Sequence, residues 1–322
     1  MKKIVALIGA GACVLGVALI AIAFLFARKD LSMLNTGVEY DKLQYVCTKD
    51  VSSIEIEESS NEVFVKKGNV DKVTVDYYYN KKVLEYTFEE TNSTLTVKRV
   101  PKKNSFSGGI NIDFDWPKLI VTVPEKEYEN IDIMLSSGGV EVSDITVNSL
   151  NIQNSSGSAK VDGIKSENLY VKNTSGSISV TGIQTTSLET SNSSGRINLS
   201  DISASSVKAQ NTSGGIHVEN VKASSVYAQS SSGSIRFTTV SADDVNGITT
   251  SGGISLEALD AASAITLQAS SGSIHGSVVG KQGDFSILTN TGSGSSNLQN
   301  GMGGSKQLNC TTTSGSIKID FE

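Results

Sequence analysis

The stretch "NTSGSISVTGIQTTSLETSNSSGRINLS", residues 173–200, contains two copies of one motif. Asn173-Thr-Ser-Gly-Ser-Ile returns nineteen residues later as Asn192-Ser-Ser-Gly-Arg-Ile. Extending the spacing in both directions finds a glycine at the same phase of seven consecutive units: Gly138, Gly157, Gly176, Gly195, Gly214, Gly233 and Gly252. A fixed period of this length is typical of repeat proteins, in which each unit stacks on its neighbour.

Apolar residues recur at fixed positions within each unit. In the unit that follows Gly176 they are Ile178, Val180, Ile183 and Leu188. Alternation of this kind indicates β-strands, and a unit this small can bury its apolar side chains only by stacking at the strand spacing of ~4.8 Å. We therefore predict an all-β fold, a parallel β-helix (β-solenoid) of nineteen-residue coils. Right-handed winding is expected, as for other parallel crossovers.

The serine-rich motif is interpreted as a structural ladder. Stacked coils place each side chain over its equivalent, so amides and hydroxyls can hydrogen-bond along the stack, and the seven glycines permit the corner conformation. The predicted ladder residues are Asn154, Asn173, Asn192, Asn211, Ser156, Ser175, Ser194 and Ser213. The asparagines also match N-glycosylation sequons, but their spacing follows the repeat.

No catalytic residue is predicted. A nucleophilic serine needs a nearby base, and the only histidines, His217 and His275, lie about three coils, or ~14 Å, apart. Asp201 and Glu219 are the best pair of carboxylates for cleaving a glycan, although solvated turns explain both. The outward column three residues after the glycine has mixed charge and no aromatic residue to stack on a sugar: Glu141, Lys160, Ser179, Asn198, His217, Arg236, Ser255 and His275.

Composition excludes several classes of function. The 322 residues carry a formal net charge of −6, which gives no attraction for nucleic acid. Cys13, Cys47 and Cys310 form neither a disulfide framework nor a metal-binding spacing, and Cys310 falls on an inward column, where a buried thiol is expected. We predict no metal, no cofactor and no small-molecule substrate.

The N-terminal residues 4–26 are uncharged and apolar or small. This run is long enough to cross a hydrocarbon core of roughly 30 Å, so residues 1–29 are predicted to be a transmembrane anchor. A cleaved signal peptide would have a shorter apolar core, and a lipoprotein cleavage site before Cys13 is the other alternative. Residues 30–50 are interpreted as a juxtamembrane linker, 51–135 as an irregular β-strand cap region and 136–322 as the solenoid repeats.

Orientation is not decided by charge, because Lys2 and Lys3 face Arg28 and Lys29 across the span. Long domains translocate largely regardless of charge, so we expect a single-pass protein of the cell membrane with its C-terminal domain outside the cytoplasm. The basic run containing Lys98, Arg99, Lys102 and Lys103 is interpreted as a solvated hairpin tip, with contact to an anionic envelope polymer or lipid headgroups as the alternative.

The combination of an anchor, SSG-containing coils and two local motifs resembles a known family. The motifs are Leu119-x-Val121-x-Val123-Pro124 and the run Ser136-Ser-Gly-Gly-Val-Glu-Val. They are similar to a bacterial putative-adhesin family of β-strand-repeat domain-of-unknown-function proteins, of the membrane-anchored type. The resemblance implies an envelope role and names no ligand. That family has no agreed catalytic residues, so no site is carried over.

Together these features predict a non-catalytic, membrane-anchored, extracytoplasmic β-solenoid that acts as an adhesin-like or cell-envelope interaction module. Its expected partners are the membrane, through the N-terminal helix, and an envelope polymer or another envelope protein. One alternative is an envelope-stress accessory protein that acts through membrane partners. A further alternative is a carbohydrate-active β-helix enzyme.

Overall fold

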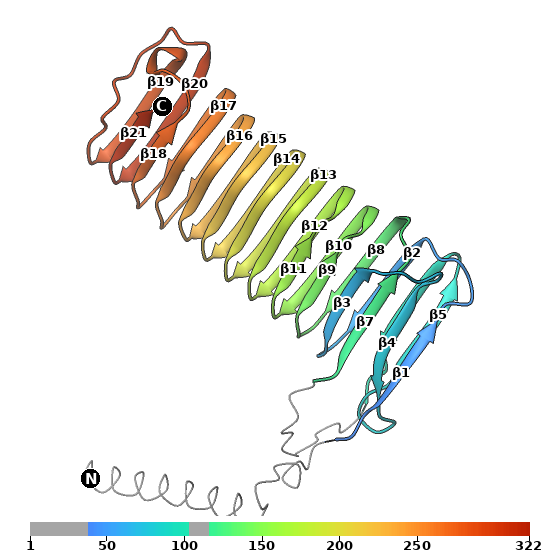
Figure 1. Cartoon of the computed structure of the whole chain (residues 1–322). Helices are drawn as coiled ribbons and strands as arrows, with labels where there is room; N and C mark the ends of the chain where they lie inside the picture. Colours follow the sequence, from blue (N-terminus) through green and yellow to red (C-terminus); the bar gives the residue numbers. More distant parts are fainter. Residues whose placement is uncertain (1–37, 103–115) are drawn as a thin grey trace, which may run out of the picture. The chain divides into compact units, whose positions relative to one another are not determined.

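The computed structural model describes residues 38–102 and 116–322 (Figure 1). The chain divides into two compact units. The smaller contains, of the described residues, 38–43, 78–85, 100–102 and 116–117, and the larger contains 44–77, 86–99 and 118–322. The predicted transmembrane anchor lies outside the described residues. Within the described ranges no helix has the length and apolar character needed to cross a membrane.

The part of the chain before the regular repeats forms short strands. They are β1 (Asp41–Val46), β2 (Ser53–Glu58), β3 (Glu62–Lys67), β4 (Thr74–Tyr79), β5 (Tyr86–Thr91), β6 (Thr94–Arg99), β7 (Lys118–Val123), β8 (Glu127–Leu135) and β9 (Val140–Ser143).

Longer strands and one short turn of 3-10 helix make up the remainder. They are β10 (Thr146–Ser156), β11 (Ala159–Asp162), β12 (Lys165–Ser175), β13 (Ile178–Ser194), β14 (Ile197–Ser213), β15 (Ile216–Ser232), β16 (Ile235–Thr249), β17 (Ile254–Ala269), β18 (Ile274–Val278), η2 (Gln282–Asp284), β19 (Phe285–Ser293), β20 (Lys306–Ser314) and β21 (Ile317–Phe321).

The large unit is a β-solenoid, as predicted from the period of the sequence. Successive coils pair in parallel, with Ile178 beside Ile197 and Ile197 beside Ile216, and Figure 1 shows β13 to β17 as successive layers of one stack. Along β13 and β14 the side chains alternate between buried and half-exposed. Each coil therefore buries one set of apolar side chains against the same set in the next coil, which is the physical basis of the repeat.

One coil departs from the period and shows where an extra residue enters. Ser241 and Ala242 pair nineteen residues ahead with Asp260 and Ala261, whereas Asp244 pairs twenty ahead with Ala264. The insertion is accommodated at one bend of β17, and the inward columns resume in register beyond it. This accounts for the twenty-residue step from Gly252 to Gly272.

Within the core, one bulky residue is matched by a missing side chain. Phe237 is completely buried in β16. A Cβ on Gly247, later in the same strand, would lie 3.0 Å from the Phe237 ring and 3.2 Å from Leu267. Interiors are packed at crystal-like density, so the glycine leaves the room that the phenylalanine needs.

The parallel stack extends on both sides of residue 136, where sequence analysis places the start of the repeats. Strand β2 pairs in parallel with β8, and β3 pairs in parallel with β9. Strands β6 and β7 then pair in parallel with β2 and β3. The layers therefore follow the order β6–β7, β2–β3, β8–β9, which differs from their order along the chain.

The C-terminal end shows the same kind of exchange. Strand β20 pairs with β17 on one side and with β19 on the other, and β21 pairs with β18. A bridge between Ser296 and Ile317 places the segment after β19 beyond β21. The last two strands of the chain, β20 and β21, therefore lie between two layers that both precede them in the sequence.

Antiparallel pairing covers strands at both ends of the stack. At one end β5 pairs antiparallel with β6, and β4 pairs antiparallel with β7. At the other end Ile287 and Gly301 exchange two backbone hydrogen bonds of 2.8 and 3.1 Å in an antiparallel bridge. An uncovered parallel edge is a template for pairing with other chains, so these strands limit edge-to-edge association.

Candidate functional site

The predicted asparagine and glycine columns are joined by hydrogen bonds between coils. Each asparagine Nδ2 donates to the carbonyl oxygen of the corner glycine sixteen residues earlier, which belongs to the preceding coil. The distances are 3.0 Å from Asn154 to Gly138, 2.7 Å from Asn173 to Gly157, 2.8 Å from Asn192 to Gly176 and 2.7 Å from Asn211 to Gly195. The ladder therefore runs from side chain to backbone, at the corner where each coil turns.

The corner glycines are required by close approach of the backbone. Gly176 and Gly195 have φ of +124° and +119°, a range that residues with a side chain rarely adopt. A Cβ on Gly195 would also lie 2.1 Å from the Gly176 carbonyl oxygen. Gly233 is not among the glycines with a positive φ. A Cβ added to it would nevertheless lie 2.0 Å from the carbonyl oxygen of Gly214. Stacking distance, more than backbone conformation, explains the complete column.

The serine column lies on the surface of the solenoid, whereas the asparagine column is buried. Ser156, Ser175, Ser194 and Ser213 pair in register and are exposed. Their contribution to the stack comes from the backbone, because the carbonyl of Ser194 accepts from Gly176 N at 3.0 Å and that of Ser213 accepts from Gly195 N at 3.0 Å. The hydroxyls point away from the core.

The asparagine column continues beyond the residues that the sequence singled out. Asn211 pairs with Ser230, and Ser230 pairs with Thr249. The hydroxyls of Ser230 and Thr249 donate to Gly214 O at 3.0 Å and Gly233 O at 2.8 Å, and Thr312 donates to Gly272 O at 2.8 Å. Counting nineteen residues onward from Asn211 gives Ser230 and Thr249. The same count does not reach Thr312, because an inserted residue and the exchanged layer lie between Thr249 and Thr312.

The same column begins with a buried carboxylate. Glu58 pairs with Leu135, which in turn pairs with Asn154. The Glu58 side chain is fully buried and accepts hydrogen bonds from the backbone of Ser59, Ser60 and Asn61, from Tyr86 Oη and from Arg99 at 2.8 Å. Charge pairing and five donors compensate its burial, so this cluster closes the turn of the first layers.

A test of the ladder is available at Asn192, whose Oδ1 is buried without a hydrogen-bond partner. Asn192→Ala removes the bond to Gly176 O and should lower the free energy of unfolding by about 1 kcal/mol. Asn192→Thr reproduces the donor found at Thr249 and should remain within about 0.5 kcal/mol of the wild type. Urea denaturation followed by circular dichroism measures both; equal losses for alanine and threonine would contradict the role assigned to the donor.

Burial also bears on the sequons. The asparagines at 154, 173, 192 and 211 are 3%, 1%, 3% and 5% exposed. An amide at this depth, already bonded to the neighbouring coil, cannot carry a glycan in the folded chain. Their repetition follows from the ladder geometry.

Outside the core, the solenoid presents two sheet faces of different chemistry. The charged face is formed by outward residues of β9, β11, β18, β21 and the first halves of β13–β17. In the columns three and five residues after each glycine, its charged and histidine residues are Glu141, Lys160, Asp162, His217, Glu219, Arg236, Glu257, His275, Lys318 and Asp320. Lys160 and Glu141 form an ion pair of 2.9 Å on it.

The second face, here called the amide face, is formed by outward residues of β10, β12 and the second halves of β13–β17. Its long polar uncharged side chains are Asn151, Gln153, Asn168, Tyr170, Gln210, Tyr227, Gln229, Asn246 and Gln268. The column that contains Tyr170 and Tyr227 lies thirteen residues after each corner glycine. The outward column of the charged face has no aromatic residue, and these two tyrosines, which the sequence-based prediction missed, lie on the other face.

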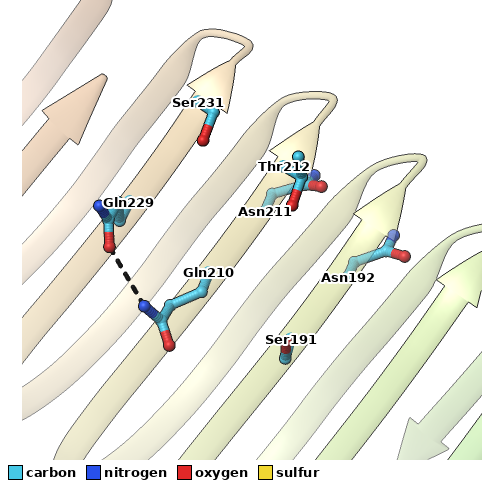
Figure 2. A pocket seen from close by; sticks show the side chains of 7 residues that line it. All are labelled: Ser191, Asn192, Gln210, Asn211, Thr212, Gln229 and Ser231. Atoms are coloured by element: carbon cyan, nitrogen blue, oxygen red, sulfur yellow. Dashed lines mark hydrogen bonds between the residues drawn. The ribbon is translucent and has the colours of Figure 1, made fainter. Parts of the chain in front are cut away.

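A shallow cavity of about 260 Å³ lies on the amide face. Figure 2 shows the seven side chains that line it: Ser191, Asn192, Gln210, Asn211, Thr212, Gln229 and Ser231. Gln210 Nε2 donates to Gln229 Oε1 at 3.1 Å, and Tyr227 Oη donates to the same oxygen at 2.9 Å. These contacts hold the Gln229 amide in one orientation across neighbouring coils.

Comparison with known proteins identifies the family. The sequence model of the family described as Toastrack DUF4097 matches residues 51–220 and 187–322. The chain belongs to the Toastrack DUF4097 family. This confirms the resemblance to a β-strand-repeat family of unknown function that the SSG-containing coils indicated. No curated protein matches the chain.

Several solved structures are similar to this Toastrack chain at low sequence identity. One is a "putative adhesin" from Parabacteroides distasonis ATCC 8503, with 13% identity, 88% of this chain and 98% of that chain covered, and a TM-score of 0.47. Another is a "putative adhesin" from Bacteroides fragilis NCTC 9343, with 13% identity, coverage of 88% and 97%, and a TM-score of 0.37. A "putative lipid binding protein" from P. distasonis has 16% identity, coverage of 89% and 98%, and a TM-score of 0.45.

The candidate catalytic carboxylates of this Toastrack protein lie at a coil bend. Asp201 has a positive φ of 55°, and its Oδ1 accepts a hydrogen bond from Asn220 Nδ2. Both Asp201 and Glu219 are exposed. This is the environment of solvated turn residues, in which an amide from the next coil holds the aspartate.

The two cysteines among the described residues are buried and free of disulfides. Burial raises the pKa of the Cys310 thiol to about 12. Burial, with a contribution from the Glu90 carboxylate, raises the pKa of Cys47 to about 11. Thiols kept in the protonated form are poor nucleophiles and poor metal ligands, so Cys310 has the structural role expected from its inward position.

The basic run is paired with carboxylates where the structure describes it. Lys98 forms an ion pair of 2.8 Å with Glu57, and Arg99 bonds Glu58. Lys98 and Arg99 lie on β6 inside the stack of layers, so these two positions are not a hairpin tip. Lys103 lies outside the described residues. Within 38–102 and 116–322, no group of three or more histidine, cysteine or acidic side chains is placed to hold a metal.

Proposed function

We propose that this Toastrack chain is a non-catalytic interaction module of the cell envelope, held at the membrane by residues 4–26 and displaying a right-handed solenoid outside the cytoplasm. The observation that carries the proposal is the repetition of outward side chains in register. Tyr227 and Gln229 stand over Lys208 and Gln210 of the preceding coil. Such columns form extended surfaces that several coils contribute to, which suits binding to a long or repeated partner.

Three further features support the module. The family match covers both the first layers and the regular coils, so one continuous architecture forms the displayed part. Antiparallel strands cover the edge at one end of the stack, and an antiparallel bridge covers one point of the edge at the other end, which favours binding on the faces. The 23 uncharged residues at 4–26 have the length of a bilayer span.

Topology is tested with protease added to intact, wall-stripped cells that express the full-length chain. We expect cleavage in the part of the predicted linker that precedes β1, residues 30–40, and release of a folded fragment that carries the solenoid. The compact β-layers should resist digestion, because their backbone hydrogen bonds are paired between coils. Cleavage only after the membrane is permeabilised would place the solenoid in the cytoplasm and overturn the proposal.

Interaction is tested separately by sedimenting the purified full-length chain with isolated cell-envelope material. We expect the chain to sediment with the envelope and to remain bound after a detergent wash that removes lipid. Failure to sediment would remove the basis for an envelope-binding module.

A further inference from the structure

We propose that the amide face binds an uncharged glycan chain laid across successive coils, with Tyr170 and Tyr227 as aromatic contacts and the Gln210–Gln229 pair as the polar contact. This inference rests on the proposed envelope-binding function and names the ligand class and the surface. Four observations carry it: the charge of the face, its amides, its tyrosines and its cavity.

The first observation is the charge balance of the amide face. In β10, β12 and β13–β16, three outward columns of this face lie eleven, thirteen and fifteen residues after the corner glycines. Their charged residues are Lys172, Glu189, Lys208 and Asp244, two of each sign. Lys208 and Glu189 neutralise one another in an ion pair of 2.8 Å. The face therefore has no net charge to attract a polyanion. The charged face, in contrast, has His217 beside Arg236 and His275 beside Lys318.

The second observation is the free hydrogen-bonding capacity of the glutamine pair. Gln229 Oε1 accepts from both Gln210 Nε2 and Tyr227 Oη. The Gln229 amide nitrogen and the Gln210 amide oxygen are left to face a ligand, one as donor and one as acceptor. A sugar hydroxyl is both donor and acceptor, so neighbouring hydroxyls of one sugar can satisfy this pair.

The third observation is the placement of the two tyrosines in one column. Tyr170 pairs with Glu189, Glu189 with Lys208 and Lys208 with Tyr227. Three strand spacings separate the rings, or about 14 Å along the stack. Both tyrosines are half-exposed. A tyrosine offers an apolar ring with a polar tip, which suits the C–H face and the hydroxyl rim of a sugar.

The fourth observation is the cavity between the glutamine column and the corners. It spans three coils, from Ser191 to Gln229 and Ser231, and is lined by hydroxyl and amide side chains (Figure 2). A polymer with hydroxyls at regular intervals fits this shape better than a compact apolar molecule.

Binding of two soluble probes to the purified full-length chain tests the inference by calorimetry. The probes are hexasaccharides of β-1,4-linked glucose and of β-1,4-linked N-acetylglucosamine, and heparin is the polyanion comparison. We expect at least one hexasaccharide to bind, and Tyr170→Ala/Tyr227→Ala to weaken it about tenfold. The matched variant His217→Ala/Arg236→Ala, in the same region of the stack but on the charged face, should bind as the wild type does.

A second variant keeps the test decisive if the tyrosine substitutions disturb folding. Gln229→Ala removes a half-exposed surface amide together with its hydrogen bonds from Gln210 and Tyr227, and should weaken binding several-fold with a nearly unchanged thermal transition. Lack of binding by both hexasaccharides, binding of heparin alone, or equal affinity of the wild type and the folded amide-face variants would each overturn the inference.

Envelope sedimentation separates this inference from the proposed function. If the tyrosine variant sediments as fully as the wild type, the glycan inference falls while envelope binding stands. If protease treatment of the envelope material abolishes sedimentation, the partner is a protein and the glycan inference falls again. If the wild type does not sediment at all, the proposed function itself fails.

Discussion

Gly195→Ala is expected to cause a large loss of stability, about 4 kcal/mol. Two effects act together. The φ of +119° is poorly accessible to alanine, and the new Cβ would lie 2.1 Å from the Gly176 carbonyl oxygen. That oxygen accepts the hydrogen bond from Asn192 Nδ2, so moving it also disturbs the ladder. The midpoint of urea unfolding, followed by circular dichroism, measures the loss.

Two matched variants separate the causes. A Cβ on Gly283 meets nothing within 4 Å, so Gly283→Ala should change stability by less than about 0.5 kcal/mol. Gly233 is not among the glycines with a positive φ, but a Cβ added to it would lie 2.0 Å from the carbonyl oxygen of Gly214. Gly233→Ala should therefore also be strongly destabilising. If Gly195→Ala unfolds at the same urea concentration as Gly283→Ala, the coils are not stacked at the distance described here.

Ile197→Asp is the second change with a large expected effect. Ile197 is completely buried and stacks between Ile178 and Ile216. An unpaired carboxylate in this column should cost several kcal/mol, because the interior offers it neither a cation nor water. Asn198 is the matched control: it is the next residue along the same strand, half-exposed, with His217 beside it.

Asn198→Asp should alter the free energy of unfolding by less than about 0.5 kcal/mol, since the carboxylate stays in water. The comparison is made by chemical denaturation of the two variants at neutral pH. Similar losses for the two substitutions would mean that the inward and outward columns are assigned to the wrong faces.

Function in this architecture depends on which outward columns a ligand meets. In β13–β17 the first half of each strand contributes to the charged face and the second half to the amide face. A partner that reads one face need not contact the other, so variants such as Arg236→Ala and Tyr227→Ala divide the surface without entering the core.

The repeat itself was readable from the sequence. Because identical units stack by translation, every residue in contact with its equivalent carries the same constraint, and the constraint reappears at a constant interval. That is why Gly176, Gly195 and the inward Ile178 and Ile197 predict the solenoid and its register from the sequence alone. The asparagine column was found in the same way, since Asn173 and Asn192 pair directly.

The target of the asparagine amide could not be read from the period. A column predicts that equivalent residues lie over one another, but the donor of Asn192 bonds Gly176 O in place of the next asparagine. Which acceptor the amide meets depends on how the backbone bends at the corner. The nineteen-residue repeat shows which residues stack and contains no information about that bend. The same limit applies to Gly247, whose missing side chain makes sense only once Phe237 is placed across the core.

The order of layers at the two ends was decided by tertiary structure alone. Strand β2 has inward Ile54 and Ile56 where β6 has inward Leu95 and Val97, so the alternation alone does not tell which of the two layers lies next to β8. The exchange arises from pairings between distant residues, such as Ile54 with Ile131 and Leu308 with Ile265, and from the need to cover parallel edges with antiparallel strands. Periodicity specifies which residues face inward; only the complete set of strand pairings specifies which coil lies on which.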